Sequence, residues 1–226
     1  VDAAGRAIGY VGVQRDVSGR KRAAAVTEQL RLARSIQQSF FPDSPPAVPG
    51  FDLGGASYAA EETGGDYYDY LQMPGGRIGI VLADVSGHGL GPALVMSQTR
   101  AYLQALLPLG LDVGELATRL NDFLLADHQE ARFVTLFLAQ LDTREGSFCY
   151  ASAGHRCYVL GPGDEVEPLD ATSVPLGILP GCVPSAPMRT LRPGQVVLFP
   201  TDGVEDTESP QGVPFAWPGG AFNIAF

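Results

Sequence analysis

The chain has few cysteines and lacks long apolar runs. Its three cysteines, Cys149, Cys157 and Cys182, form no close Cys-x-x-Cys pair in 226 residues. A disulfide framework or a structural zinc site is therefore disfavoured. No segment approaches the roughly 18 consecutive apolar residues of a membrane helix, and no basic start leads into an apolar signal sequence. We expect no membrane segment in this fragment, a cytoplasmic location, and a chain that is part of a longer protein.

Basic residues are also scarce. The chain has 15 Lys and Arg against 25 Asp and Glu, a formal net charge of -10 and a pI of about 4.6. A general nucleic-acid or anionic-membrane surface is disfavoured on these grounds, and we expect no nucleic-acid partner. A protein partner or a cation fits the charge better. With 45% hydrophobic residues, the chain can bury one sizeable core.

Alternating apolar residues predict a strand at residues 8–17. One strand cannot bury its own face. The segment from Gly9 to Lys21 resembles the last strand and exit of PAS sensor domains. We therefore expect residues 1–19 to be the C-terminal remnant of a PAS-like domain.

A helix is predicted from Gly19 to Phe41, with Pro42 ending it. Apolar residues recur at helical spacing along it, with charged residues on the other faces. Such a helix either packs on its own domain or pairs with a copy of itself, which would make residues 22–41 a dimerising, signal-transmitting segment. The apolar positions are Val26, Leu30, Ala33, Ile36 and Phe40.

The central part of the chain mixes strands and helices. A strand buried on both faces is predicted at residues 77–83, ending at Asp84. A helix at about 91–107 follows, and a second helix begins at Asp112 with a capping box completed by Glu115. A hairpin and two further strands are predicted after the helices. This order predicts an α+β fold with antiparallel sheets and helices on their outer faces. The strands after the helices are expected at 133–141, 147–152, 158–160 and 195–199.

Three aspartates lie beside glycines, and two of them follow predicted strands. They are Asp66, Asp84 and Asp202. Carboxylates at strand ends, next to backbone that permits close approach, provide the oxygen ligands that hard divalent cations prefer. Each dipeptide alone is also an ordinary turn signal. Together they predict one metal site.

Four motifs now carry a resemblance to a known family. They are Gly-Gly-Asp-Tyr-Tyr-Asp at 64–69, Asp-Val-Ser-Gly-His-Gly at 84–89, Ala-Gly-His at 153–155 and Thr-Asp-Gly-Val at 201–204. In this order they resemble the bacterial branch of the metal-dependent type 2C (PPM) protein serine/threonine phosphatases, which includes the stage II sporulation protein E phosphatase. Residues 33–42 are similar to the helix and proline that precede the catalytic domain there, so the resemblance covers roughly residues 30–212.

The resemblance implies a domain organisation and a fold. Residues 20–42 would be a linker or signalling helix, 43–212 a truncated phosphatase domain and 213–226 an atypical tail. The family fold is a pair of packed antiparallel β-sheets flanked by helices, an α-β-β-α sandwich. The implied substrate is a phosphorylated regulatory protein similar to an anti-anti-sigma factor.

The resemblance also implies site residues. Asp84 would bridge two Mn²⁺ or Mg²⁺ ions, the backbone carbonyl of Val85 would complete the first site, and Asp202 would bind the second ion. Asp66 would bind an ion directly or through water, and Asp66 and Asp84 would be the catalytic pair. Two adjacent cations would activate water, so no protein nucleophile is required.

Neighbouring residues leave alternatives open. His88 could protonate a leaving group or be satisfied by backbone. Asp69 could hydrogen-bond to the metal ligands and orient them, or it could simply be solvated. His155 is expected to be structural, and Ser86 has no paired base at a recognisable spacing.

The C-terminal part departs from the family pattern. Family members usually end with an Asp-Asp pair that helps to bind the second ion, whereas no aspartate follows Asp206. We therefore expect a C-terminally incomplete domain with a weakened second ion site. The alternative to an enzyme is a catalytically impaired remnant that acts only as a partner-binding or dimerising module.

Overall fold

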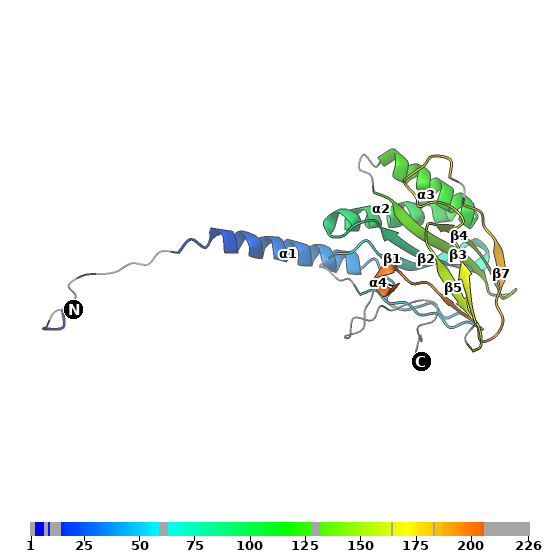
Figure 1. Cartoon of the computed structure of the whole chain (residues 1–226), viewed down its shortest axis with the longest axis horizontal. Helices are drawn as coiled ribbons and strands as arrows, with labels where there is room; N and C mark the ends of the chain where they lie inside the picture. The colour runs from blue at the N-terminus through cyan, green and yellow to red at the C-terminus, as the bar shows by residue number, and fades with distance from the viewer. Residues whose placement is uncertain are drawn as a thin grey trace.

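The computed structural model describes residues 3–6, 9, 15–58, 63–127, 132–163, 165–182 and 184–205. The predicted strand at 8–17 lies largely outside these ranges, and the tail at 213–226 lies entirely outside them. Figure 1 shows helix α1 (Ser18–Gln38) extending away from a body of sheets and helices.

Two antiparallel sheets form this body, which confirms the predicted α+β class. The larger sheet has the strand order β1-β2-β3-β4-β7, and the smaller has the order β6-β5-β8. The first consists of β1 (Tyr67–Met73), β2 (Arg77–Val85), β3 (Val134–Asp142), β4 (Ser147–Ala153) and β7 (Met188–Thr190), and the second of β5 (Cys157–Leu160), β6 (Val166–Leu169) and β8 (Val196–Leu198). The remaining helices are α2 (Leu90–Leu106), α3 (Val113–Asp127), α4 (Asp202–Glu205) and the short 3₁₀ helices η1 (Pro74–Gly76) and η2 (Leu107–Leu109).

Alternate residues of β3 enter two different cores. Leu136 and Leu138 belong to the cluster beneath the helices, and Phe137 and Ala139 to the cluster between the sheets. Successive side chains of a strand point to opposite faces, so a central strand between two cores is apolar at nearly every position. This explains why the runs that form β2 and β3 are almost continuously hydrophobic.

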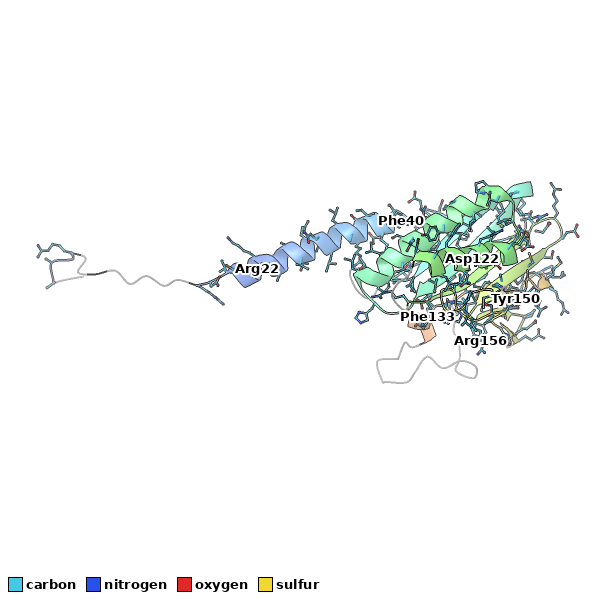
Figure 2. All side chains as sticks on the ribbon, turned by 90° about the horizontal axis from the view of Figure 1, so that it is seen from above. Arg22, Phe40, Asp122, Phe133, Tyr150 and Arg156 are labelled. Carbon is cyan, nitrogen blue, oxygen red and sulfur yellow. The ribbon has the colours of Figure 1, made fainter. Side chains whose placement is uncertain are left out.

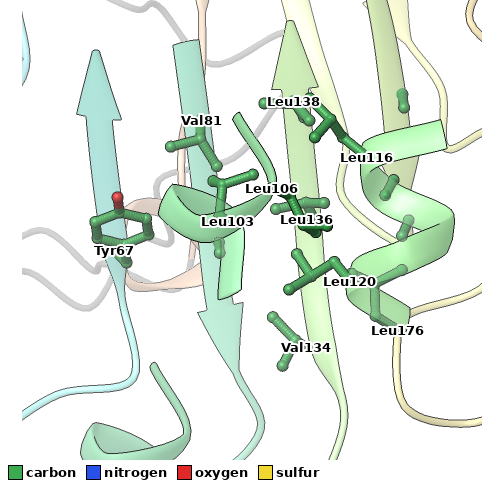
Figure 3. Packing of buried hydrophobic residues seen from close by; sticks show 14 of the residues in the cluster. Tyr67, Val81, Leu103, Leu106, Leu116, Leu120, Val134, Leu136, Leu138 and Leu176 are labelled. Atoms are coloured by element: carbon green, nitrogen blue, oxygen red, sulfur yellow. The ribbon is translucent and has the colours of Figure 1, made fainter. Parts of the chain in front are cut away.

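Helices α2 and α3 cover one face of the larger sheet. Figure 3 shows Leu103 and Leu106 of α2 and Leu116 of α3 packing over strands β2 and β3. Burying a leucine side chain fully contributes roughly 1.5–3 kcal/mol, so this layer fixes the sheet that carries the site.

The smaller sheet packs on the opposite face of the larger one. The ring of Phe137 stacks on Tyr150 at 4.9 Å and meets Phe199 edge-on at 5.3 Å. The predicted pair of packed antiparallel sheets is thus confirmed. In the described part of the chain, α2 and α3 form a layer only on the larger sheet.

Several predicted boundaries differ from the observed ones by a few residues. Strand β2 continues to Val85, because Val85 still pairs with Val134 of β3. Helix α1 ends at Gln38 rather than Phe41, because the N–H of Ser39 bonds back to the carbonyl of Ile36 and begins a turn. The predicted strand at 195–199 is shortened to Val196–Leu198, and Val196 is exposed.

The predicted start of α3 is confirmed. The N–H of Glu115 donates to Asp112 Oδ1 at 2.8 Å, and the N–H of Asp112 donates to Glu115 Oε2 at 3.2 Å. These reciprocal bonds are the capping box that the sequence predicts.

Helix α1 contacts the body mainly through its C-terminal end. Figure 2 shows Arg22 far out on the helix and Phe40 where the chain meets the body. Phe40 packs against the core and lies 5.0 Å beneath the guanidinium of Arg100, whereas Val26 is 54% exposed. None of the described helices combines the length and apolar character needed to cross a bilayer.

Candidate active site

A pocket of about 750 Å³ opens where the ends of several elements meet. The end of α1, the loop before β1, the end of β2 and the start of α4 all contribute to its lining. All three predicted ligand aspartates line it, together with Val85 and His88. Further lining residues include Arg34, Gln37, Gly64, Gly65, Thr135 and Gly203.

Strand register brings Asp66 and Asp84 together. Tyr67 pairs with Ala83 across the antiparallel strands β1 and β2. The residues one step further along each strand are Asp66 and Asp84, and residues opposite each other in such a pair lie about 4.5–5.5 Å apart at Cβ. The two carboxyl groups hydrogen-bond to each other. The register therefore explains how residues 18 positions apart converge.

Burial and mutual repulsion perturb both carboxyl groups. Burial, followed by the charges of Asp66 and Asp202, raises the pKa of Asp84 to about 7. Burial also raises the pKa of Asp66, against the hydrogen bonds from Thr201 and Asp84 that lower it. Two acidic groups in contact cannot both ionise without cost, and a bound cation removes that cost.

Asp202 also lines the pocket and is the first residue of α4. The residue before it, Thr201, donates its hydroxyl to Asp66 Oδ2 at 3.2 Å. Asp202 is close enough for its charge to raise the pKa of both Asp66 and Asp84. Three residues separate it from β8, so it does not follow the strand directly as predicted.

The described acidic side chains do not by themselves form a closely packed ligand cluster. Within the described ranges, no three Asp, Glu, His or Cys side chains gather closely enough to hold a single ion. Asp66, Asp84 and Asp202 nevertheless line one pocket, together with Val85.

Gly65 lets the loop before β1, Gly64–Gly65–Asp66, approach strand β2. We call this segment the ligand loop. A Cβ built on Gly65 would lie 2.6 Å from the carbonyl oxygen of Val85 and 3.3 Å from Cβ of Pro92. No side chain fits at that distance, so only glycine allows Asp66 and the Val85 carbonyl to sit side by side. The result is an oxygen-lined cradle that suits a hard divalent cation such as Mn²⁺ or Mg²⁺.

A buried histidine connects the segment before Asp202 to the larger sheet. His155 is 7% exposed, and its Nε2 lies 2.8 Å from the carbonyl oxygen of Pro200. Because a carbonyl only accepts, Nε2 carries the proton. Its Nδ1 lies 2.9 Å from the hydroxyl of Thr135, the residue that pairs with Asp84. His155 thus fixes the segment leading to Asp202 relative to β3.

The other predicted residues have different surroundings. His88 lines the pocket in the turn before α2. Asp69 does not line it; its Oδ2 accepts hydrogen bonds from the Tyr67 hydroxyl at 2.8 Å and from Gln104 of α2 at 3.2 Å. The hydroxyl of Ser86 accepts from the N–H of Phe133 at 3.1 Å.

Sequence reasoning missed the residues that position the ligands. Thr201 directly precedes Asp202, and its place in the Thr-Asp-Gly-Val motif is the one feature of the sequence that could have identified it. Thr135 and Gln37 carry no pattern that marks them, because their contacts join segments distant in the chain.

The fold matches those of known protein structures. The SiaA-PP2C domain of Pseudomonas aeruginosa superposes with a TM-score of 0.68 at 20% identity, covering 88% of this chain and 80% of that one. At this identity the likeness concerns the fold. The fold is thus similar to that of a PP2C domain.

Family membership follows from the sequence. The model for stage II sporulation protein E (SpoIIE) matches residues 74–216, more than half of the chain. The chain therefore belongs to the SpoIIE family. The match includes Asp84, Val85 and Asp202 and begins after Asp66.

Two curated relatives have similar sequences. Phosphoserine phosphatase RsbU of Bacillus subtilis (strain 168) is 26% identical over 189 residues, covering 83% of this chain and 56% of RsbU. Phosphoserine phosphatase RsbP of the same organism is 28% identical over 184 residues, covering 79% of this chain and 45% of RsbP. The chain spans about half the length of these relatives.

Proposed function

We propose that this chain is a metal-dependent protein phosphatase that hydrolyses phosphoserine or phosphothreonine on a regulatory protein in signal transduction. The observation that carries the proposal is the contact between the Asp66 and Asp84 carboxyl groups in a pocket that Asp202 also lines. Membership of the SpoIIE family and the similarity to two phosphoserine phosphatases support it.

The aspartates would hold two Mn²⁺ or Mg²⁺ ions. When bound, these ions would supply charge for the phosphoryl oxygens and acidify water. Asp66 and Asp84 with the Val85 carbonyl would form one position, Asp202 would serve the other, and Asp84 would be shared. Thr201 would hold the Asp66 carboxylate in orientation through its hydrogen bond.

The reaction needs no covalent enzyme intermediate. A water oxygen would form a bond to phosphorus and give up a proton, while the bond from phosphorus to the serine or threonine oxygen breaks. That oxygen would take up a proton, so the products are inorganic phosphate and the free hydroxyl. Ser86 is not the nucleophile in this scheme, in which water attacks directly; its hydroxyl accepts a hydrogen bond from the N–H of Phe133. His88 lines the same pocket and is the residue we propose to test as the source of that proton.

We further propose how the domain is used. The substrate would resemble an anti-anti-sigma factor, as the motif resemblance implies. The similarity to the phosphoserine phosphatases RsbU and RsbP supports a phosphoserine substrate. Residues 20–42 would be a linker that dimerises and transmits a signal to the phosphatase domain at 43–212. The exposed apolar residues of α1, such as Val26 and Ile36, support this use of the helix.

The proposal is tested by hydrolysis of a phosphoserine peptide and of a phosphorylated anti-anti-sigma factor. We expect turnover that needs Mn²⁺ or Mg²⁺ and falls by at least about a hundredfold in Asp84→Asn and Asp66→Asn. The matched control is Asp122→Asn, an exposed aspartate on α3 labelled in Figure 2, which should leave turnover unchanged.

Two outcomes would contradict the proposal. Turnover without divalent cations, or turnover unchanged in Asp84→Asn, would remove the metal mechanism. Absent turnover in a well-folded, Mn²⁺-loaded chain would favour the alternative of a partner-binding or dimerising module.

A further inference from the structure

Gln37 is an unusual residue in α1. The helix is described over its whole length, and Gln37 is its one buried residue, at 8% exposure. The neighbouring apolar side chains Leu32 and Ile36 are 63% and 53% exposed. An exposed helix that buries an amide in place of its apolar residues is not docked by hydrophobic packing alone. The burial of Gln37 therefore needs another explanation.

Both ends of the Gln37 carboxamide bind one residue of the ligand loop. Its Nε2 donates to the carbonyl of Gly64 at 2.7 Å, and its Oε1 accepts from the N–H of Gly64 at 3.2 Å. These paired bonds satisfy the donor and the acceptor of Gly64 together. They fix the orientation of its backbone as well as its position.

The bound residue lies two positions before Asp66. The intervening residue is Gly65, which packs against the Val85 carbonyl. Two successive glycines have the greatest backbone freedom of any dipeptide and offer no side chain to anchor the loop. The two bonds from Gln37, which we call the clamp, restrain Gly64 from outside the loop, two residues before Asp66.

The clamp itself is held firmly. Phe40, three residues after Gln37, packs on the core beneath Arg100, and the ring of Phe41 lies 5.5 Å from that of Tyr68 on β1. The chain directly after the last turn of α1 is thus packed against the body. Any displacement of this turn would pull on the Gly64 peptide.

We propose that Gln37 is a positioning residue that holds the Gly64–Gly65–Asp66 loop in its metal-binding conformation, so that the last turn of α1 sets the affinity of the site for its cation. The inference rests on the proposed function, because it takes Asp66 as a ligand. Side chains that support metal ligands typically change affinity 10–100-fold when they are replaced.

The direct test compares Gln37→Leu with Gln29→Leu in the full chain. The control makes the same chemical change at an exposed position of the same helix. Mn²⁺ affinity is measured by calorimetry and by the EPR signal of free Mn²⁺. We expect the dissociation constant of Gln37→Leu to rise about 10–100-fold and that of Gln29→Leu to stay at the wild-type value.

Two further readouts separate positioning from general damage to the fold. The Mn²⁺ concentration for half-maximal activity should shift upward in Gln37→Leu, with kcat restored at saturating Mn²⁺. In metal-free protein, hydrogen exchange of the Gly64 amide should become faster while amides of β2 and β3 keep their wild-type rates. Gln37→Met, which keeps the length of the side chain, provides the same test should the leucine variant fold poorly.

The outcomes are distinguishable. If wild-type protein binds Mn²⁺ and Gln37→Leu binds it equally well with unchanged Gly64 exchange, the positioning role is wrong and the proposed function stands. If the wild type binds no Mn²⁺ although Gly64 exchange depends on Gln37, the proposed function fails and the clamp remains as a structural contact.

Discussion

Gly65 sets how closely Asp66 approaches strand β2. A methyl group at this position would collide with backbone, the carbonyl of Val85, which cannot rotate away as a flexible side chain could. Relief of the collision must therefore move the loop or the end of the strand. Either movement separates the predicted ligands.

We predict that Gly65→Ala lowers metal-dependent turnover at least about tenfold and destabilises the fold by about 1–3 kcal/mol, the usual cost of overpacking. Turnover and denaturant unfolding provide the two measurements. Gly54→Ala is the matched control, because a Cβ at Gly54 meets nothing within 4 Å. Equal behaviour of the two variants would show that the close approach is not needed.

Asp84 links the site to stability in metal-free protein. Its pKa is raised to about 7 by burial and by the neighbouring carboxylates, against about 3.9 in an unfolded chain. The folded state therefore keeps a proton that the unfolded chain loses, and stability falls as pH rises between about 4 and 7.

We predict that Asp84→Asn is more stable than the wild type at pH 8 in EDTA, by about 1–2 kcal/mol after allowing for partial exposure of the group. The difference should vanish below about pH 4, where Asp84 is protonated in both states. Saturating Mn²⁺ should reverse the order by stabilising only the wild type. Urea unfolding at the two pH values measures this, and a variant that is less stable at pH 8 would count against the buried acidic pair.

At the scale of single residues, sequence patterns identify the predicted metal ligands better than the residues that hold those ligands in place. Asp66 and Asp84 stand out because aspartate beside glycine at a strand end is a local pattern. The bonds of Gln37 to Gly64 and of His155 to Pro200 join residues 27 and 45 positions apart, and no local pattern encodes them. The position of Asp69 against α2 likewise depends on packing that its strand alone does not specify.

At the scale of elements, α1 carries the clearest functional expectation. Its predicted apolar stripe includes Val26, Leu30 and Ile36, and two of these side chains are more than half exposed. An apolar stripe left in water favours pairing with a second helix.

We predict that Val26→Glu shifts a dimer of the chain toward monomer in sedimentation velocity. The reason is that a charge on the stripe must be buried or must separate the helices. Leu32→Glu is the control, since Leu32 lies off the predicted stripe and is 63% exposed. An unchanged sedimentation profile for Val26→Glu would show that α1 does not mediate dimerisation.

Elements with strong periodicity or caps were predictable, and short exposed ones were not. The capping box of α3 and the buried runs of β2 and β3 are local signals that packing reinforces. Strand β7 has three exposed residues and β6 contains Pro168, so neither shows a strand pattern. Their pairing with β4 and β5 depends on neighbours already in place.

At the scale of the whole molecule, the site requires the entire body of the domain. Its aspartates come from residues 66, 84 and 202, and strand register and the His155 contacts unite them. A net charge of -10 adds a general attraction for cations, while the absence of a nucleic-acid partner stays a prediction.

The most direct measurement is anomalous diffraction at the manganese edge from crystals grown with Mn²⁺. We predict one peak within about 2–2.5 Å of the Asp66 or Asp84 carboxylate and the Val85 carbonyl, and a second beside Asp202. Peaks confined to other surfaces, with the pocket free of manganese at millimolar concentration, would contradict the account.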